Sequence, residues 1–169
     1  MGKEIELKLI FPESERARLL AHPLLCAAPL VGTPQVLFNT YFDTENLALH
    51  AAKMAVRTRK TDEGMRQTVK CASASVGGLS IRPEWEQPFD GRFDFSAITD
   101  TRVRAELEAL LPVLQPVFTT DFHRETRVVH WPSRIQEKKP AKTGRKNEGA
   151  AEIHVMLDLG RVLSKGKES

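Results

Sequence analysis

Apolar and polar residues alternate along several short stretches of the chain, which is the pattern of β-strands with one buried face. Residues 1–11 form the first stretch, and its charged positions are Glu4, Glu6 and Lys8. Because successive side chains of a strand point to opposite sides, these three are expected on one face and the apolar residues between them on the other. Two carboxylates and an ammonium on one face indicate a site for a metal or a phosphate.

Six further stretches of this kind follow, at residues 35–43, 53–60, 65–72, 79–87, 117–131 and 151–160. The turn sequence of residues 61–64 predicts a hairpin between two of them. Two other segments have apolar residues at helical spacing, from Pro12 to about Pro23 and from residue 101 to residue 111. Many strands and few helices predict an α+β fold in which a helix covers one face of the sheet.

The charged positions of the later strands are Arg57, Arg59, Arg66, Lys70, Glu84, Glu86 and Arg124. Any one of these stretches is also typical of the solvent-facing side of an antiparallel sheet. Several of them together favour a shared surface, because strands side by side in a closed sheet would point their charged faces into a common lumen. Such a lumen could hold a chain of phosphates, which arginine and lysine bind well. A divalent metal would bridge these phosphates to Glu4 and Glu6, which would otherwise repel them.

The composition restricts the kinds of partner. With 169 residues the chain is long enough for one domain with a sizeable core. Its 25 Lys and Arg residues against 22 Asp and Glu residues give a formal net charge of +3, which permits an anionic ligand. Only 7% of the residues are aromatic, and no stretch combines them with a basic stripe, so we expect no nucleic-acid partner.

Other features bear on location and mobility. The two cysteines, Cys26 and Cys71, have no metal-binding spacing, and no apolar run is long enough for a signal peptide or a membrane span. We therefore expect a cytoplasmic protein with no membrane partner. Residues 133–150 are basic and poor in apolar residues, which predicts a flexible, solvated loop.

In their order along the chain, these motifs resemble the CYTH group, the triphosphate tunnel metalloenzymes. The signature of that group, Glu-x-Glu-x-Lys, corresponds to Glu4, Glu6 and Lys8. The resemblance continues through residues 41–44, 57–59, 68–70, 77–79, 82–84, 120–124 and 157–160. The Gly-Gly-Leu and Arg-Pro-Glu segments, together with Thr-Asp-Phe-His-Arg, most resemble the bacterial inorganic triphosphatases.

The resemblance implies an antiparallel β-barrel of eight strands that forms a tunnel, with helices packed outside it. Glu4, Glu6 and Asp158 would bind a Mg²⁺ or Mn²⁺ ion. The phosphates would be bound by Lys8, Arg57, Arg59, Lys70 and Arg124. Lys70 would also act as a catalytic residue and assist the attacking water, because an ammonium among other cations gives up a proton more readily. The implied reaction is metal-dependent hydrolysis of inorganic triphosphate to pyrophosphate and phosphate.

The chain departs from the family pattern at its C-terminal end. Relatives carry a further acidic strand after the Leu-Asp-x-Gly segment, whereas this sequence stops at Ser169 without one. We therefore expect a single domain, residues 1–169, that is truncated at its C-terminus, has an incomplete tunnel and exposes a sheet edge that could pair in a homodimer. His154 also stands where relatives often have an acid. A CHAD domain often follows such domains, so we expect one in a longer form of the protein.

Two alternatives stay open. Adenylate cyclases and thiamine triphosphatases share the triphosphate-binding scaffold and differ around the organic end of the substrate. A non-catalytic module that binds polyphosphate would keep the basic lumen without a complete metal site. Metal-dependent turnover of a panel of triphosphates would separate these alternatives.

Overall fold

The computed structural model describes residues 2–61, 64–71, 75–76, 79–131, 151–164 and 167–168. The strands are β1 (Gly2–Leu7), β2 (Gln35–Asp43), β3 (Met54–Thr61), β4 (Gly64–Cys71), β5 (Ser75–Val76), β6 (Leu79–Pro88), β7 (Gln115–Trp131), β8 (Ala151–Ser164) and β9 (Lys167–Glu168). The helices are η1 (Glu13–Glu15), α1 (Arg16–Leu20), α2 (Pro23–Cys26), α3 (Ala48–Ala51), α4 (Thr101–Leu110) and η2 (Leu111–Val113).

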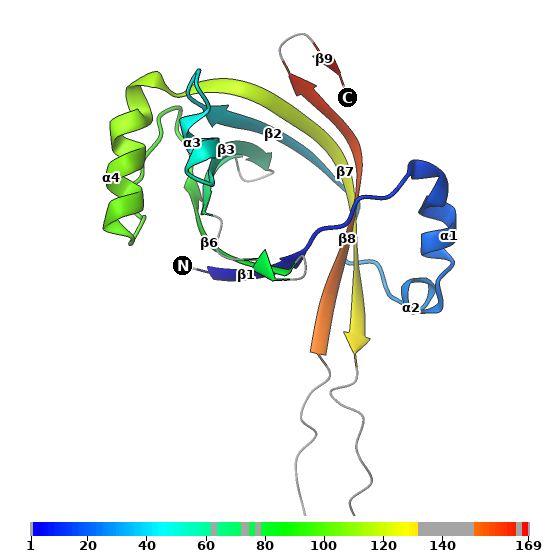
Figure 1. The fold of residues 1–169 in the computed structure, drawn as a ribbon. Coiled ribbons are helices and arrows are strands. Elements are labelled where there is room, and N and C mark those ends of the chain that lie inside the picture. The colour runs from blue at the N-terminus through cyan, green and yellow to red at the C-terminus, as the bar shows by residue number, and fades with distance from the viewer. Residues whose placement is uncertain are drawn as a thin grey trace, which may run out of the picture. The chain divides into compact units, whose positions relative to one another are not determined.

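The strands form one sheet in the order β1-β6-β4-β3-β2-β7-β8-β9, with β5 paired to β6. The pairings of β6 with β1 and β4, of β3 with β2 and β4, and of β8 with β9 are antiparallel. The predicted α+β fold with an antiparallel sheet is thus confirmed (Figure 1). Among the described residues the strand order is open, running from β1 to β9, whereas the eight-stranded barrel that the resemblance implied would be closed.

The chain divides into two compact units. Unit 1 consists of Met1–Ile10, Val36–Phe122 and Gly160–Ser169, and unit 2 of Phe11–Gln35 and His123–Leu159. Strands β7 and β8 each contribute residues to both units. In the described part of the chain, no helix combines the length and the apolar character needed to cross a bilayer.

The core of unit 1 forms between the sheet and α4. Its buried members are Leu49, Met54, Val56, Val69, Trp85, Phe95, Ile98 and Leu107. Helix α4 begins at Asp100, whose carboxylate accepts hydrogen bonds from the backbone N–H groups of Arg102 and Val103, a standard N-cap. Figure 1 shows the sheet of unit 1 as a curved layer, with α3 and α4 on its convex side. The helix predicted over residues 101–111 is confirmed, and it covers one face of the sheet as expected.

A buried amide ties the segment that follows β6 to this sheet. The side chain of Gln67 in β4 accepts a hydrogen bond from the backbone N–H of Asp94 and donates one to the carbonyl of the same residue. Gln87 in β6 donates to the same carbonyl. These bonds satisfy a polar group that is only 3% exposed, and they hold Phe95 against the core.

The first strand is shorter than predicted. It ends at Leu7, which pairs with Leu79, the first residue of β6. The side chains of Leu7 and Leu9 are 56% and 74% exposed, so the expected apolar face is not buried along the whole of residues 1–11. The pairing partner, which the local sequence does not specify, decides where this strand stops.

Two helical regions also differ from the prediction. Pro23 starts a helix instead of ending one, because the first helical position tolerates proline and His22 caps the turn by accepting a hydrogen bond from Leu24 N. Residues 44–52, between two predicted strands and outside both predicted helices, contain the short helix α3. The carboxylate of Asp43 accepts hydrogen bonds from the backbone N–H groups of Thr44, Leu49 and His50, which stabilises that turn of helix.

Unit 2 has a small core of its own, made by Leu25, Ala28 and Val129 with Leu19 and Val155 packed against it. Arg127 on β7 donates hydrogen bonds to the carbonyls of Leu25 and Ala28 at the end of α2. Arg16 on α1 forms an ion pair with Glu125 on β7, with 2.6 Å between Nη2 and Oε1. Polar contacts therefore attach both helices to β7.

The hairpin of β3 and β4 is confirmed, with a register in which Thr61 pairs with Gly64 and Met54 with Cys71. Residues 62–63 of its turn, the Gly77–Gly78 connection and the predicted loop 133–150 lie outside the described residues.

Candidate functional site

The polar face of the unit 1 sheet carries several of the predicted site residues. In β3, Met54, Val56 and Thr58 are buried on the core side. Arg57 and Arg59 alternate with these residues, so they project from the other side. We use the name basic face for the surface formed there by Arg57, Arg59, Arg66, Lys70, Glu84 and Glu86. Because α4 covers the apolar face, the basic face is on the concave side of the curved sheet (Figure 1).

The strand register explains why these charges meet. Residues paired across an antiparallel ladder point to the same side of the sheet. Arg57 pairs with Thr68 and Arg59 with Arg66 between β3 and β4, and Lys70 pairs with Glu84 between β4 and β6. The predicted gathering of cations from β3 and β4 on one surface is therefore present in unit 1.

Glu84 contacts two of the predicted phosphate ligands at once. Its Oε2 is 3.3 Å from Lys70 Nζ, and its Oε1 is 3.8 Å from Arg57 Nη2. The side chains are 21% exposed for Glu84, 20% for Lys70 and 12% for Arg57. Partial burial lowers the local dielectric, so these charges interact more strongly than an ion pair on an open surface.

Glu86, two residues along β6, has a similar role for Arg66. The two side chains form an ion pair with 2.6 Å between Nε and Oε1, and Thr68 donates a hydrogen bond of 3.3 Å to the other carboxylate oxygen. The two acids of β6 therefore supply counter-charges for cations of β3 and β4.

Arg59 is held by a buried hydrogen-bond chain. Its Nε donates to Asn39 Oδ1 at 2.7 Å, and Asn39 Nδ2 donates to Thr120 Oγ1 at 2.8 Å. Asn39 is 2% exposed and Thr120 is 5% exposed. An amide bonded at both ends in a buried position has one preferred orientation, so it fixes where the guanidinium of Arg59 lies.

The predicted metal ligands Glu4 and Glu6 lie on β1 at the edge of the same sheet. Their backbone partners on β6 are Arg82 and Ser80. The side chain of Glu6 is half-buried. Lys8 follows the end of β1 and is exposed, so the strand does not hold it in alternation with the two glutamates.

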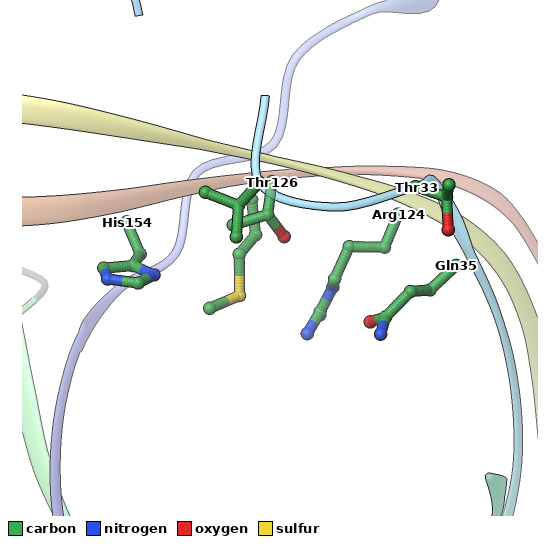
Figure 2. Close-up of a pocket in the computed structure, with 7 residues that line it drawn as sticks. Thr33, Gln35, Arg124, Thr126 and His154 are labelled. Carbon is green, nitrogen blue, oxygen red and sulfur yellow. The ribbon is translucent and has the colours of Figure 1, made fainter. Parts of the chain in front are cut away.

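Arg124 and Asp158, the remaining predicted residues, form a bidentate ion pair in unit 2. Both oxygens of the aspartate accept from the guanidinium, at 2.7 Å each. Arg124 lines a pocket of about 250 Å³ together with Val31, Thr33, Gln35, Thr126, His154 and Met156. Figure 2 shows Arg124, Gln35 and His154 projecting to the same side of the strands. The alternation predicted for the strands at residues 117–131 and 151–160 is consistent with the shared lining of this pocket by β7 and β8.

The described residues contain no group of three His, Cys, Asp or Glu side chains close enough to bind a metal ion. Within them Asp158 is bound to Arg124, and Glu84 is paired with Arg57 and Lys70. Cys71 follows Lys70 but packs on the core side of the sheet. Burial, together with the carboxylates of Asp100 and Glu106, raises the pKa of its thiol, so this thiol stays protonated and is a poor nucleophile.

The predicted set of site residues left out Glu84 and Asn39. Glu84 was visible in the sequence as a charged residue alternating with Trp85, but nothing local showed that it would face Lys70 and Arg57. Asn39 lies in a β-branched and aromatic stretch, where it reads as an ordinary strand residue. Both partnerships depend on residues distant in the sequence.

The sequence is similar to a known protein family and to a curated protein. The family model described as CYTH domain matches residues 2–167. An inorganic triphosphatase of Haemophilus influenzae is 30% identical over 173 aligned positions, which cover 97% of this chain and 42% of that protein. The chain thus spans less than half the length of the curated relative that it matches.

A solved structure agrees with the fold. The crystal structure of a "putative adenylate cyclase" from Bacillus halodurans superposes with a TM-score of 0.53 at 18% identity, covering 99% of this chain and 78% of that one. At this identity the likeness concerns the fold alone. Because the family model covers nearly the whole sequence, the chain belongs to the CYTH domain family.

Proposed function

We propose that the chain hydrolyses inorganic triphosphate to pyrophosphate and phosphate, with the phosphates bound on the basic face and a divalent metal ion as cofactor. The observation that carries the proposal is the cluster of Arg57, Lys70 and Glu84 on the concave side of the unit 1 sheet. The 30% identity to an inorganic triphosphatase supports the choice of substrate.

Arg57, Arg59 and Lys70 would bind the phosphate chain. The planar fork of arginine matches two phosphate oxygens, and lysine supplies a compact charge. The Nε atom of Arg57 is buried and has no hydrogen-bond partner among the described residues. Buried donors without a partner are uncommon, and a phosphate oxygen would satisfy this one. Lys8 and Arg124 are proposed as further phosphate ligands.

Glu4, Glu6 and Asp158 are proposed to hold the metal ion. Their carboxylate oxygens are the donors that Mg²⁺ and Mn²⁺ prefer, so the donor chemistry fits. Asp158 would have to exchange its contact with Arg124 for the ion. When bound, the ion would neutralise charge on the phosphates and favour attack of water at the terminal phosphorus.

Hydrolysis requires water to attack the terminal phosphorus while its bond to the bridging oxygen breaks. Arg57, Arg59 and Lys70 would hold that phosphoryl group in place and offset the charge that accumulates on its oxygens. Lys70 is additionally proposed to assist the attacking water. Its Nζ atom would do so from its place beside Glu84, 3.3 Å from Oε2 of that carboxylate.

A polyphosphate-binding module without catalysis is the second candidate function. It is favoured by one observation, that no three potential metal ligands gather within the described residues. Such a module would bind inorganic triphosphate through the same cations and release no phosphate.

The test is phosphate release from inorganic triphosphate, ATP and thiamine triphosphate, each with Mg²⁺ and with Mn²⁺. We expect inorganic triphosphate to be cleaved fastest, and no turnover when both metals are removed. The double variant Glu4→Gln, Glu6→Gln should lose turnover. In Lys70→Met, the rate of phosphate release should fall about 100-fold or more. Lys60→Met, an exposed lysine of β3, is the matched control and should keep the activity.

The other outcomes decide between the alternatives. Equal or faster cleavage of ATP or thiamine triphosphate would reject the inorganic substrate. Tight triphosphate binding without hydrolysis in either metal would identify the non-catalytic module.

A further inference from the structure

We propose that Glu84 is a positioning residue that holds Arg57 and Lys70 side by side, so that both reach the same phosphate group. This inference rests on the proposed function, because it assigns a task to a residue beside the proposed phosphate ligands. Glu84 itself would touch neither the substrate nor the metal ion.

The strand register makes this role possible. Lys70 is the direct cross-strand partner of Glu84, so the two side chains leave the sheet next to each other. Arg57 lies one strand further away, opposite Thr68. The short side chain of Thr68 leaves the Arg57 guanidinium within 3.8 Å of the Glu84 carboxylate. One carboxylate thus spans three strands and uses a different oxygen for each cation.

Electrostatics give the reason for such a residue. Arg57 and Lys70 carry like charges and are 12% and 20% exposed, so their repulsion is only partly screened by water. A carboxylate between them offsets that repulsion and keeps two long side chains in one arrangement. Without it, the cations would separate, and they would no longer reach the same phosphate oxygens at the same time.

The charge of Glu84 has a second effect on the bound anion. A carboxylate near a triphosphate repels it, so the ground-state affinity does not gain from this residue. The expected benefit therefore appears in the rate of the chemical step, where misplaced cations stabilise the transition state less well.

The test uses Glu84→Gln, which keeps the shape of the side chain and removes its charge. We expect kcat for inorganic triphosphate to fall about 10-fold to 100-fold, while KM stays equal or decreases. Glu108→Gln makes the same charge change on the exposed side of α4 and should leave kcat unchanged. A wild-type kcat in Glu84→Gln, or a loss caused only by a higher KM, would overturn the proposal.

A double-mutant cycle separates positioning from general stability. If Glu84 acts in part through Lys70, the loss in the variant combining Glu84→Gln with Lys70→Met should be smaller than the product of the two single losses. If Glu84 only stabilises the fold, the two losses should multiply, and a multiplied loss would overturn the proposal. Thermal unfolding of all variants accounts for any loss of folded protein.

The same cycle can be followed by binding. If the wild-type protein releases no phosphate, the proposed function fails, but calorimetric titration with inorganic triphosphate still compares the four proteins. Non-additive changes of affinity would then support the coupling of Glu84 to Lys70, and additive changes would reject it.

Discussion

At the scale of single residues, each cation of the basic face has a specific partner. Arg57 and Lys70 contact Glu84, Arg66 pairs with Glu86, and Arg59 donates to Asn39. Glu84 is a partly buried acid and Glu86 an exposed one, whereas Asn39 is a buried neutral amide. Because Asn39 is neutral, this contact orients Arg59 without placing a counter-charge beside its guanidinium.

Asn39→Ala tests this arrangement. We expect the free energy of unfolding to fall by about 1–3 kcal/mol, because Thr120 and Arg59 lose a buried partner. The affinity for inorganic triphosphate should fall about tenfold, because Arg59 is no longer oriented. Urea unfolding and calorimetric titration measure the two effects.

Thr120→Val is the matched control for that experiment. It removes the far end of the hydrogen-bond chain and leaves the contact between Asn39 and Arg59 in place. We expect a loss of stability with little change in affinity. If Asn39→Ala and Thr120→Val lose the same affinity, the hydrogen-bond chain affects binding through the stability of the fold and not through the orientation of Arg59.

At the scale of elements, the sheet depends on a close approach between β7 and β8. A Cβ atom on Gly160 would overlap the backbone of Asp121 and Phe122. Glycine at this position therefore lets the two strands approach closely, which a larger residue would prevent. The Leu-Asp-x-Gly segment named in the sequence motif thus contains a residue with a packing role.

Gly160→Ala is expected to destabilise the protein by about 1–3 kcal/mol or more, because the backbone contacted is rigid and must move. The control is Ile153→Ala on the same strand. Ile153 is 45% exposed, so this substitution should change the free energy of unfolding little. Urea unfolding with an unchanged stability for Gly160→Ala would show that β8 shifts without cost.

Among the elements, the regular ones were the most predictable. The apolar spacing of residues 101–111 predicted α4, and the turn sequence predicted the hairpin of β3 and β4. The end of β1 and the short helix α3 were not predicted correctly, because the first depends on where β6 begins and the second on hydrogen bonds to Asp43. Neither cause is visible in a local pattern.

At the scale of the whole molecule, the two units have cores of different size. Among the residues that the structure describes, the core cluster of unit 1 buries eight, with further apolar side chains packed against them. The cluster of unit 2 contains Leu25, Ala28 and Val129. Because burial of apolar surface is the main stabilising term, unit 2 is expected to open more easily.

Hydrogen exchange followed by mass spectrometry tests this difference. We expect the slowest exchange in peptides from β3 and β4, whose backbone pairs on both sides within unit 1. Peptides from α1 and α2 should exchange faster. Saturating inorganic triphosphate should slow exchange in β3 and β4 further if the basic face binds it. Slower exchange in α1 and α2 than in β3 and β4 would contradict the expected order of stability.

The sequence by itself determined the class of fold and the family, because alternation, turn residues and motif spacing are local properties. It also placed Arg57, Arg59 and Lys70 on the polar sides of their strands, since the two-residue period fixes the side once the strand forms. Only the tertiary structure decided which acid faces which cation. That depends on the register between strands, which the buried core of the sheet and α4 fixes and no single stretch of the chain contains.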